Sequence, residues 1–395
     1  MRRIAAQYIY PLNSLKPIPM GVITLDDDGK IHKIGQLNEE TESTEFYNGI
    51  LVPGFVNTHC HIELSHLKGA FETGTGMTGF IKQITELRER AERDNRVLSL
   101  EKEMKLLYDS GVSAMADISN CGESFSSKSL SPIYTRTFIE VFGTEPEQST
   151  DIMLRASHLK EVAHELGIDA APTPHSCYTM STKLLRDSCN AALSEGWLSY
   201  HNQESWEEEE MIINGRGPLS KRYLERGLST PPVKGVPALI YFLEILKSTG
   251  NLNNQKILLV HNTFTNQESV IRATEEIKSL FWAICPLSNL FIHNALPPIE
   301  LLRRHNAAIT IGTDSLSSNT TLSITEEIKA IHKFFPKIPL REILEWSSYN
   351  GARFLGIEDR FGSFEPGKSP GVVLIENIDW ERERLGERSF SRRLV

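Results

Sequence analysis

The sequence predicts an α/β fold: a (β/α)8 TIM barrel with a small β-sandwich domain formed by both ends of the chain. Three observations predict it. Apolar, strand-like runs alternate with amphipathic stretches of helical period between residues 51 and 357. Eight such runs occur, which is the number of strands in a barrel of this kind. Short runs separated by turn residues fill residues 1–50 and 358–395, so these ends are assigned to one discontinuous small domain.

The small domain is expected to contain a hairpin near its start. Two β-like runs, Gly21–Leu25 and Ile31–Gly35, flank an aspartate-rich segment in which Asp28-Gly29 supplies the turn. Near the other end of the chain, the turn-rich segment Gly362–Gly371 leads into the apolar run Val372–Ile375. The two ends therefore share one strand-and-turn pattern.

Within residues 51–357, predicted strands and helices follow one another in order. The strands are Leu51–Asn57, Gly111–Ile118, Arg136–Phe142, Ile168–Pro172, Leu198–Tyr200, Lys256–Val260, Phe281–Ile284 and Ala307–Ile311. The helices include Thr78–Arg96, Leu98–Asp109, Thr182–Glu195, Val236–Lys247 and Glu268–Ser279. A doubly wound sheet is the alternative architecture. Polar residues after so many strands favour a closed barrel, because a barrel gathers all its strand ends at one rim.

The composition is ordinary for a globular protein and argues against several classes of partner. The 395 residues carry a net charge of −9 and no dense cluster of Lys and Arg, so we expect no nucleic-acid partner. No stretch reaches the roughly 18 apolar residues of a membrane span. The five cysteines lack paired spacing, which is typical of a reducing compartment, and we expect a cytoplasmic protein. The acidic run Glu207–Glu210 is expected to be a solvated face. Homo-oligomerisation is left open.

The most informative segment is Leu51–His61, an apolar run that ends in His59 and His61. Side chains two apart on a strand point to the same side, so both imidazoles can reach one metal ion. By the same alternation, Cys60 between them points away from the metal. Barrel active sites lie at the C-terminal ends of the strands, which is where a catalytic metal would bind.

Further polar residues follow other predicted strands. They are His175 after the fourth strand, His201 and Glu204 after the fifth, His261 after the sixth and Asp314 after the eighth. A single histidine at such a position is most often a hydrogen-bonded structural residue. Five histidines and an acid at the same end of successive strands have no packing explanation, so we interpret them as one functional site. The remaining candidates His293, His305 and His332 lack a matching partner and are interpreted as structural or exposed.

These segments resemble the amidohydrolase superfamily, and in particular its nucleobase-deaminase and chlorohydrolase branch. The motifs that carry the resemblance are Pro53–His61 (PGFVNTHCH), His201-x-x-Glu204, Cys285–Asn289 (CPLSN), Gly312–Ser315 (GTDS) and Asn350–Gly356 (NGARFLG). The resemblance covers nearly the whole chain. It implies a (β/α)8 barrel that carries a small β domain built from both termini.

The resemblance also implies a set of roles. One divalent metal, expected to be zinc with iron(II) as the alternative, would be held by His59, His61, His201 and Asp314. Asp314 would accept a proton from water, and His261 would stabilise charge at the attacked carbon. Glu204 would protonate a ring nitrogen of the substrate and then the departing ammonia. His175 would contact the substrate. A second metal bridged by Glu140 is the alternative to a single ion.

The segment after the histidine pair bears on the substrate. Ile62–His66, followed by Gly74–Gln83, resembles the 6-aminodeoxyfutalosine deaminases. The resemblance implies deamination of an adenine-type nucleoside such as 6-aminodeoxyfutalosine, with Glu63 and His66 as candidate substrate contacts. Deamination of a guanine- or pterin-type compound and hydrolysis of a carbon–chlorine or amide bond are the alternatives. A non-enzymatic scaffold would lack metal ligands, and none is missing. The sequence therefore predicts an aminohydrolase that acts on non-peptide carbon–nitrogen bonds of a small molecule.

Overall fold

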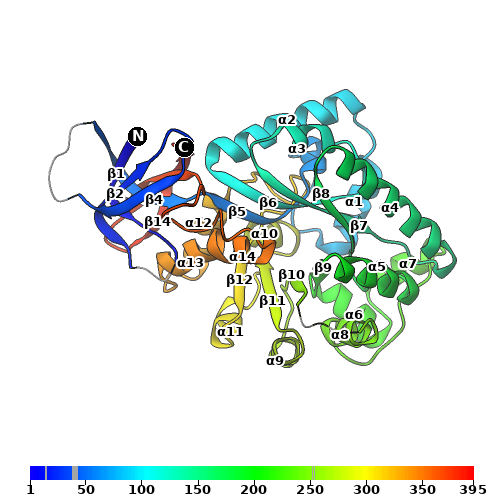
Figure 1. Cartoon of the computed structure of the whole chain (residues 1–395). Helices are drawn as coiled ribbons and strands as arrows, with labels where there is room; N and C mark the ends of the chain where they lie inside the picture. Colours follow the sequence, from blue (N-terminus) through cyan, green and yellow to red (C-terminus); the bar gives the residue numbers. More distant parts are fainter. Residues whose placement is uncertain (14–15, 38–42, 251, 253) are drawn as a thin grey trace.

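The computed structural model describes residues 1–13, 16–37, 43–250, 252 and 254–395. Within these residues the strands form three sheets. Two parallel sheets come from the middle of the chain, and a mixed sheet built from both ends lies beside them (Figure 1). The expected α/β class is confirmed.

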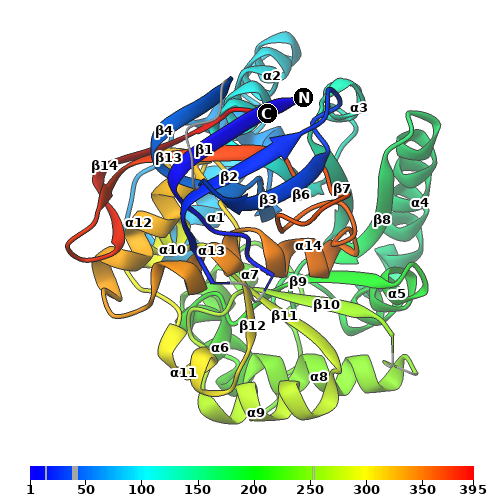
Figure 2. The ribbon, with the colours of Figure 1, turned by 60° about the vertical axis from the view of Figure 1, so that its left-hand side comes forward.

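The mixed sheet joins the two ends of the chain in the strand order β14-β13-β4-β1-β2-β3. Its strands are β1 (Arg2–Ile9), β2 (Ile18–Leu25), β3 (Ile31–Gln36), β4 (Thr44–Pro53), β13 (Val372–Asp379) and β14 (Arg384–Arg393). The predicted hairpin is confirmed, because β2 and β3 pair antiparallel. Gly29 in its turn has φ of 75°, a conformation that glycine adopts without strain. The first and last residues lie close together on this sheet (Figures 1 and 2).

The two parallel sheets each have four strands within the described residues. One contains β5 (Phe55–Cys60), β6 (Val112–Ser119), β7 (Tyr134–Val141) and β8 (Asp169–Pro174). The other contains β9 (Trp197–Asn202), β10 (Lys256–His261), β11 (Ser279–Ile284) and β12 (Ala308–Ile311). The sheets contact each other at both edges: His201 N donates to His175 O at 2.9 Å, and Thr313 N donates to His59 O at 2.9 Å. The first contact joins the carboxyl ends of β8 and β9, and the second brings the carboxyl ends of the first and last parallel strands together.

Helices connect the strands and cover the outer faces of the parallel sheets (Figure 2). They are α1 (Gly76–Leu87), α2 (Arg93–Ser110), α3 (Phe125–Leu130), α4 (Ser149–Glu165), α5 (Thr182–Ser194), α6 (Trp206–Asn214), α7 (Pro218–Glu225), α8 (Ala238–Ser248), α9 (Gln267–Glu276), α10 (Pro286–His293), α11 (Ile299–Arg304), α12 (Ile324–Phe334), α13 (Leu340–Ser347) and α14 (Tyr349–Leu355), with short 3-10 helices η1 (Ile62–Leu67) and η2 (Pro146–Gln148). In the described part of the chain, none of them is long and apolar enough to cross a bilayer.

Two expectations about helices were wrong. The predicted helix Thr78–Arg96 is interrupted after α1, because residues 88–92 offer only polar side chains and one alanine to the core. The acidic run Glu207–Glu210 is a solvated face only in its second half, since Glu207 and Glu208 are 3% and 0% exposed. Both carboxylates accept backbone N–H groups instead, from Met77 and Thr78 for Glu207 and from Glu204 for Glu208. The N–H groups in the first turn of a helix have no partner within the helix and need such acceptors.

Gly54 links the mixed sheet to the first parallel strand, since it is the single residue between β4 and β5. A Cβ atom at this position would lie 1.9 Å from Ser113 Oγ and 2.5 Å from Pro370 O. Only glycine fits between β6 and the C-terminal segment here. The strand that carries His59 is therefore placed by close backbone packing at its beginning.

Candidate metal centre

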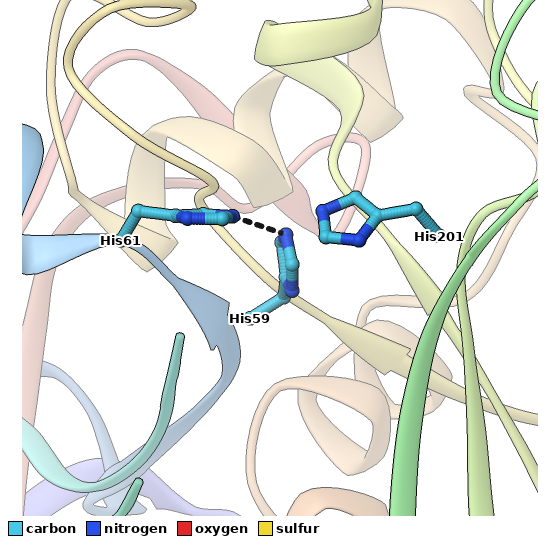
Figure 3. Close-up of side chains that lie close together, drawn as sticks. All are labelled: His59, His61 and His201. Carbon is cyan, nitrogen blue, oxygen red and sulfur yellow. Dashed lines mark hydrogen bonds between the residues drawn. The ribbon is translucent and has the colours of Figure 1, made fainter. Parts of the chain in front are cut away.

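His59 and His61 lie at the end of β5 and point toward one another (Figure 3). Their Nε2 atoms are 3.2 Å apart, and the two rings are inclined at 83°. Two nitrogen ligands of a tetrahedral zinc ion stand about 3.3 Å apart when the Zn–N distances are about 2.0–2.1 Å. The pair therefore matches the spacing of two ligands on one ion. Cys60 packs in the apolar core, as strand alternation predicts.

His201, at the end of β9, completes a cluster with this pair. One ring nitrogen from each of His59, His61 and His201 lies within 4.8 Å of the other two. All three side chains are buried. Burial lowers the pKa of His59 and of His201 well below the usual range of imidazole. Both rings are thus neutral near pH 7, which is the form that binds metals.

Asp314 follows β12 and faces the same cluster. Its Oδ1 lies 3.8 Å from His59 Nε2 and 3.6 Å from His61 Nε2. Its Oδ2 accepts hydrogen bonds from Ser288 Oγ at 2.6 Å and from Ser318 Oγ at 2.8 Å. Burial alone would raise the pKa of Asp314, but the nearby histidines and the Ser288 hydroxyl outweigh it and lower the pKa. The carboxylate is therefore ionised and fixed in orientation.

Gly312 explains why the end of β12 can approach the end of β5 so closely. A Cβ atom on Gly312 would lie 2.6 Å from His59 Cβ and 3.0 Å from the His59 backbone nitrogen. The glycine in the motif GTDS thus lets Asp314 reach the histidine pair. Asp314 itself has φ of 58°, a conformation that costs energy for a residue with a side chain.

Glu204 and His261 form a second pair beside the cluster. Glu204 Oε1 lies 3.4 Å from His261 Nε2, and Tyr178 donates its hydroxyl proton to Glu204 Oε2 at 3.3 Å. Burial, together with the charges of Asp314 and Glu208, raises the pKa of Glu204 well above its usual range. Burial lowers the pKa of His261 to about 4. Burial therefore favours the protonated form of the Glu204 carboxyl group and the neutral form of the His261 imidazole.

His175 stacks on His201, with ring centroids 4.3 Å apart and planes inclined at 21°. Its Nδ1 contacts the hydroxyls of Ser176 at 2.7 Å and Thr179 at 2.9 Å, which fix the ring. Burial lowers the pKa of His175, so the ring is neutral. The predicted substrate contact therefore lies beside the cluster, on the face of a metal-ligand candidate.

Glu63 and His66, the other predicted substrate contacts, lie in η1 and bond to groups of the chain. Glu63 Oε1 accepts from Arg88 Nη2 at 2.5 Å, and Glu63 Oε2 accepts from the backbone N–H of Asn120 at 3.1 Å. His66 Nε2 contacts the backbone oxygen of Arg88 at 2.9 Å. Both residues therefore contact Arg88, the residue that follows α1.

Several residues that support the site carried no predicted role. Ser288 holds Asp314, and Asn289 Nδ2 lies 3.2 Å from His261 Nδ1. Both belong to the motif CPLSN, which signalled the family but not these contacts. Glu140 Oε1 lies 3.3 Å from His201 Nδ1, although Glu140 entered only as a bridge between two metals. His332 was expected to be structural or exposed, and it accepts the backbone N–H of Leu385 in a buried position.

Buried, neutral histidines and an ionised aspartate lie together at the carboxyl ends of the parallel strands. This arrangement is typical of metal-dependent enzymes with α/β folds. The chain belongs to the amidohydrolase family, whose model matches residues 50–383. The family predicted from the sequence motifs is therefore confirmed.

Individual relatives agree with this assignment. An adenosine deaminase of Helicobacter pylori is 26% identical over 86% of this chain and 84% of its own length. An aminodeoxyfutalosine deaminase of Nitratiruptor sp. is 27% identical over 83% of this chain and 79% of its own length. The crystal structure of Helicobacter pylori aminofutalosine deaminase in complex with methylthio-coformycin has a TM-score of 0.79 at 22% identity, covering 96% of this chain and 93% of that one. This last likeness concerns the fold.

Proposed function

We propose that the protein is a metal-dependent aminohydrolase that releases ammonia from an adenine-type nucleoside, with 6-aminodeoxyfutalosine as the first candidate substrate. The observation that carries the proposal is the position of Glu204. Its buried carboxyl group lies three residues after a candidate metal ligand, contacts His261, and has a raised pKa. That is the form of a proton shuttle for ring-nitrogen protonation. The names of the relatives support the adenine-type substrate.

The residues present fit a single divalent ion. His59, His61 and His201 would supply imidazole nitrogens and Asp314 a carboxylate oxygen, a donor set that suits zinc, with iron(II) as the alternative. A second group of possible ligand atoms, from Glu140, His175 and His201, also lies within 4.8 Å of one another, but it shares His201 with the first group, and we propose one ion at the first group. When bound, the metal makes water a nucleophile at neutral pH.

The side chains of the chain would move the protons of the reaction. Asp314 accepts a proton from the attacking water, and Glu204 donates its proton to a ring nitrogen next to the attacked carbon. A carbon–oxygen bond then forms, and the neutral imidazole of His261 stabilises the charge on the oxygen through a hydrogen bond. Glu204 then takes up the proton of the hydroxyl group on the attacked carbon and passes it to the leaving amino group as the carbon–nitrogen bond breaks, and the proton on Asp314 returns to Glu204. His175 holds the ring, while contacts of Glu63 and His66 with the substrate stay a prediction.

Replacing Glu204 by glutamine tests this mechanism. E204Q keeps the size of the side chain but removes the transferable proton, so we expect metal content to stay unchanged and ammonia release to fall by about 10²–10⁴-fold. The measurement is ammonia release from 6-aminodeoxyfutalosine and adenosine, with metal analysis of the same samples. E210Q is the matched control, since Glu210 lies on α6, which begins two residues after Glu204, and pairs with Arg216 at the surface. Near-normal turnover by E204Q would remove this residue from the mechanism.

The substrate class is tested on the wild-type protein. We expect ammonia release from adenine-type nucleosides and little from guanine-type or pterin compounds. Release of chloride from a chlorinated heterocycle, without ammonia from any amine, would contradict the deaminase proposal and support the chlorohydrolase alternative.

We also propose how the sheets combine. The contacts at both edges support one closed (β/α)8 barrel of residues 51–357. The shared apolar cluster of Ile4, Ile23 and Leu374 supports a small β-sandwich of residues 1–50 and 358–395, formed by curling of the mixed sheet.

A further inference from the structure

We propose that Glu140 is a positioning residue that orients His201 toward the metal, and that a line of polar side chains holds Glu140 from the edge of the site. The inference rests on the proposed metal centre. The line runs from Arg88 through Glu63 and Asn120 to Glu140 and is called the polar relay below.

The first contact of the relay is between Glu140 and His201. Glu140 Oε1 lies 3.3 Å from His201 Nδ1, and the two residues are 7% and 4% exposed. A neutral imidazole carries one proton. Placed on Nδ1 and donated to Glu140, that proton leaves the lone pair of Nε2 for a metal. Ligands of this kind are commonly oriented by a carboxylate on their second nitrogen, which also makes the imidazole a stronger base.

The second contact fixes the carboxylate itself. Glu140 lies near the end of β7, and Asn120 is the first residue after β6. Asn120 Nδ2 donates to Glu140 Oε2 at 3.2 Å and to the backbone oxygen of Glu140 at 3.1 Å. With Oε2 held in this way, Oε1 is left to face His201. A buried carboxylate is costly unless N–H groups occupy its oxygens. Asn120 supplies one to Oε2, whereas Oε1 is buried without a hydrogen-bond partner among the described residues, and His201 Nδ1, 3.3 Å away, is placed to supply the missing donor.

The relay continues outward to a cation. Arg88 donates through Nη1 to Asn120 Oδ1 at 3.2 Å and through Nη2 to Glu63 Oε1 at 2.5 Å. Glu63 in turn accepts the backbone N–H of Asn120. Asn120 is thus hydrogen-bonded to Arg88 at its side-chain oxygen and to Glu63 at its backbone N–H, and these two bonds fix the direction of its Nδ2. Arg88 follows α1 directly and is 24% exposed, so the relay reaches the edge of the site.

The test measures metal affinity, which does not depend on turnover. Zn²⁺ affinity is obtained by competition with a chromophoric chelator, and Co²⁺ bound in place of zinc reports ligand geometry through its visible absorption. We expect E140A to bind Zn²⁺ about 10–100-fold more weakly and to show an altered Co²⁺ spectrum. E140Q should fall between E140A and the wild type, because its carbonyl oxygen can still accept the N–H of His201. If E140A does not fold, E140Q and N120A carry the test.

Two further variants define the outcome. D169N is the matched control, since Asp169 lies on β8 and pairs with Arg136 at the opposite end of the strands, and its Zn²⁺ affinity should be unchanged. N120A should weaken Zn²⁺ binding less than E140A, and the double variant should match E140A because Asn120 acts through Glu140. Additive losses would overturn the relay.

The remaining outcomes separate the inference from the proposed function. Unchanged Zn²⁺ affinity in E140A, with or without a lower unfolding temperature, would overturn the positioning role alone and leave Glu140 a structural residue. Failure of the wild-type protein to bind Zn²⁺ or iron(II) would overturn the metal centre and this inference with it.

Discussion

Glu208 shows how one buried carboxyl group ties folding to pH. Its Oε2 accepts the backbone N–H of Glu204 at 2.7 Å, and its own N–H is capped by Ser205 Oγ at 3.0 Å. Ser205 is therefore the N-cap of α6, and the side chain of Glu208 reaches back to the residue that precedes the cap. Burial, reinforced by the nearby charge of Glu209, raises the pKa of Glu208 to about 8.

A raised carboxyl pKa has a definite effect on stability. Below pH 4.5 both the folded and the unfolded chain hold the proton; between that pH and about 8 only the folded chain does. The contribution of Glu208 is therefore fully present at low pH and is lost as the pH rises to about 8. We expect E208Q, which does not titrate, to reduce the fall of unfolding free energy over this range by a few kcal/mol. Urea unfolding at several pH values, at fixed metal concentration, measures it; identical pH profiles would contradict the shift.

The residues of the site were predictable to different degrees. His59, His61 and His201 could be foreseen as neighbours, because their residue type and position after strands are local signals that parallel topology then combines. Asn120, Ser288 and Ser318 could not, because their contacts depend on side-chain directions across different strands. The buried state of Glu207 and Glu208 was also missed, since a charged run normally indicates solvent.

At the scale of elements, α1 is anchored by a residue of another helix. Glu207 on α6 accepts the N–H groups of Met77 at 2.9 Å and Thr78 at 3.0 Å, and it also contacts the Thr78 hydroxyl. The carboxylate therefore caps the first turn of α1 and complements the positive end of its dipole. Glu204, the proposed proton shuttle, lies three residues before Glu207, so the shuttle and the residue that caps α1 are held by the same short segment of chain.

Removing this cap should loosen α1. We expect E207A to lower the unfolding free energy by about 1–2 kcal/mol and to speed hydrogen exchange at Met77 and Thr78, because their amides lose an acceptor. Hydrogen exchange followed by mass spectrometry, beside urea unfolding, is the measurement. E210A on the same helix should leave both unchanged. Equal exchange rates in E207A and the wild type would show that α1 is held by its apolar face alone.

Strands were easier to predict than helices. Seven of the eight predicted parallel strands lie within a few residues of their observed ranges, because continuous apolar runs between turns have little alternative. The predicted strand Leu51–Asn57 was wrong in part, since Leu51–Pro53 are the end of β4 in the mixed sheet and β5 begins at Phe55. The break between α1 and α2 was predicted at residue 97 but lies at residues 88–92, since charged residues have good helix propensity and only the absence of a buried face marks the end of α1.

At the scale of the whole molecule, Arg393 joins the mixed sheet to the parallel sheets. From β14 it donates to Tyr108 O at 2.9 Å, to Val112 O at 2.8 Å and to Ser113 Oγ at 2.9 Å. Its guanidinium also lies 4.2 Å from the centroid of the Tyr108 ring. One side chain thus supplies hydrogen-bond donors to a backbone oxygen at the end of α2 and to another at the start of β6.

Loss of Arg393 should weaken this junction. We expect R393A to reduce the unfolding free energy by about 2–3 kcal/mol, since a charged donor is lost and backbone carbonyls stay buried without it. R392A is the control, because Arg392 pairs with Glu376 at the surface and should cost less than about 1 kcal/mol. Urea unfolding of both variants measures the difference, and equal stabilities would mean that apolar contacts alone hold the sheets together.

The direct passage from β4 through Gly54 into β5 has a consequence for how this enzyme could be divided or rebuilt. The backbone that presents the first two imidazoles is the prolongation of a strand whose neighbours come from opposite ends of the polypeptide. If the parallel sheets were expressed without the segments that form the mixed sheet, the beginning of β5 would therefore lose the strand that holds it in place. The mixed sheet is therefore part of the structure that positions the site, and not an independent appendage.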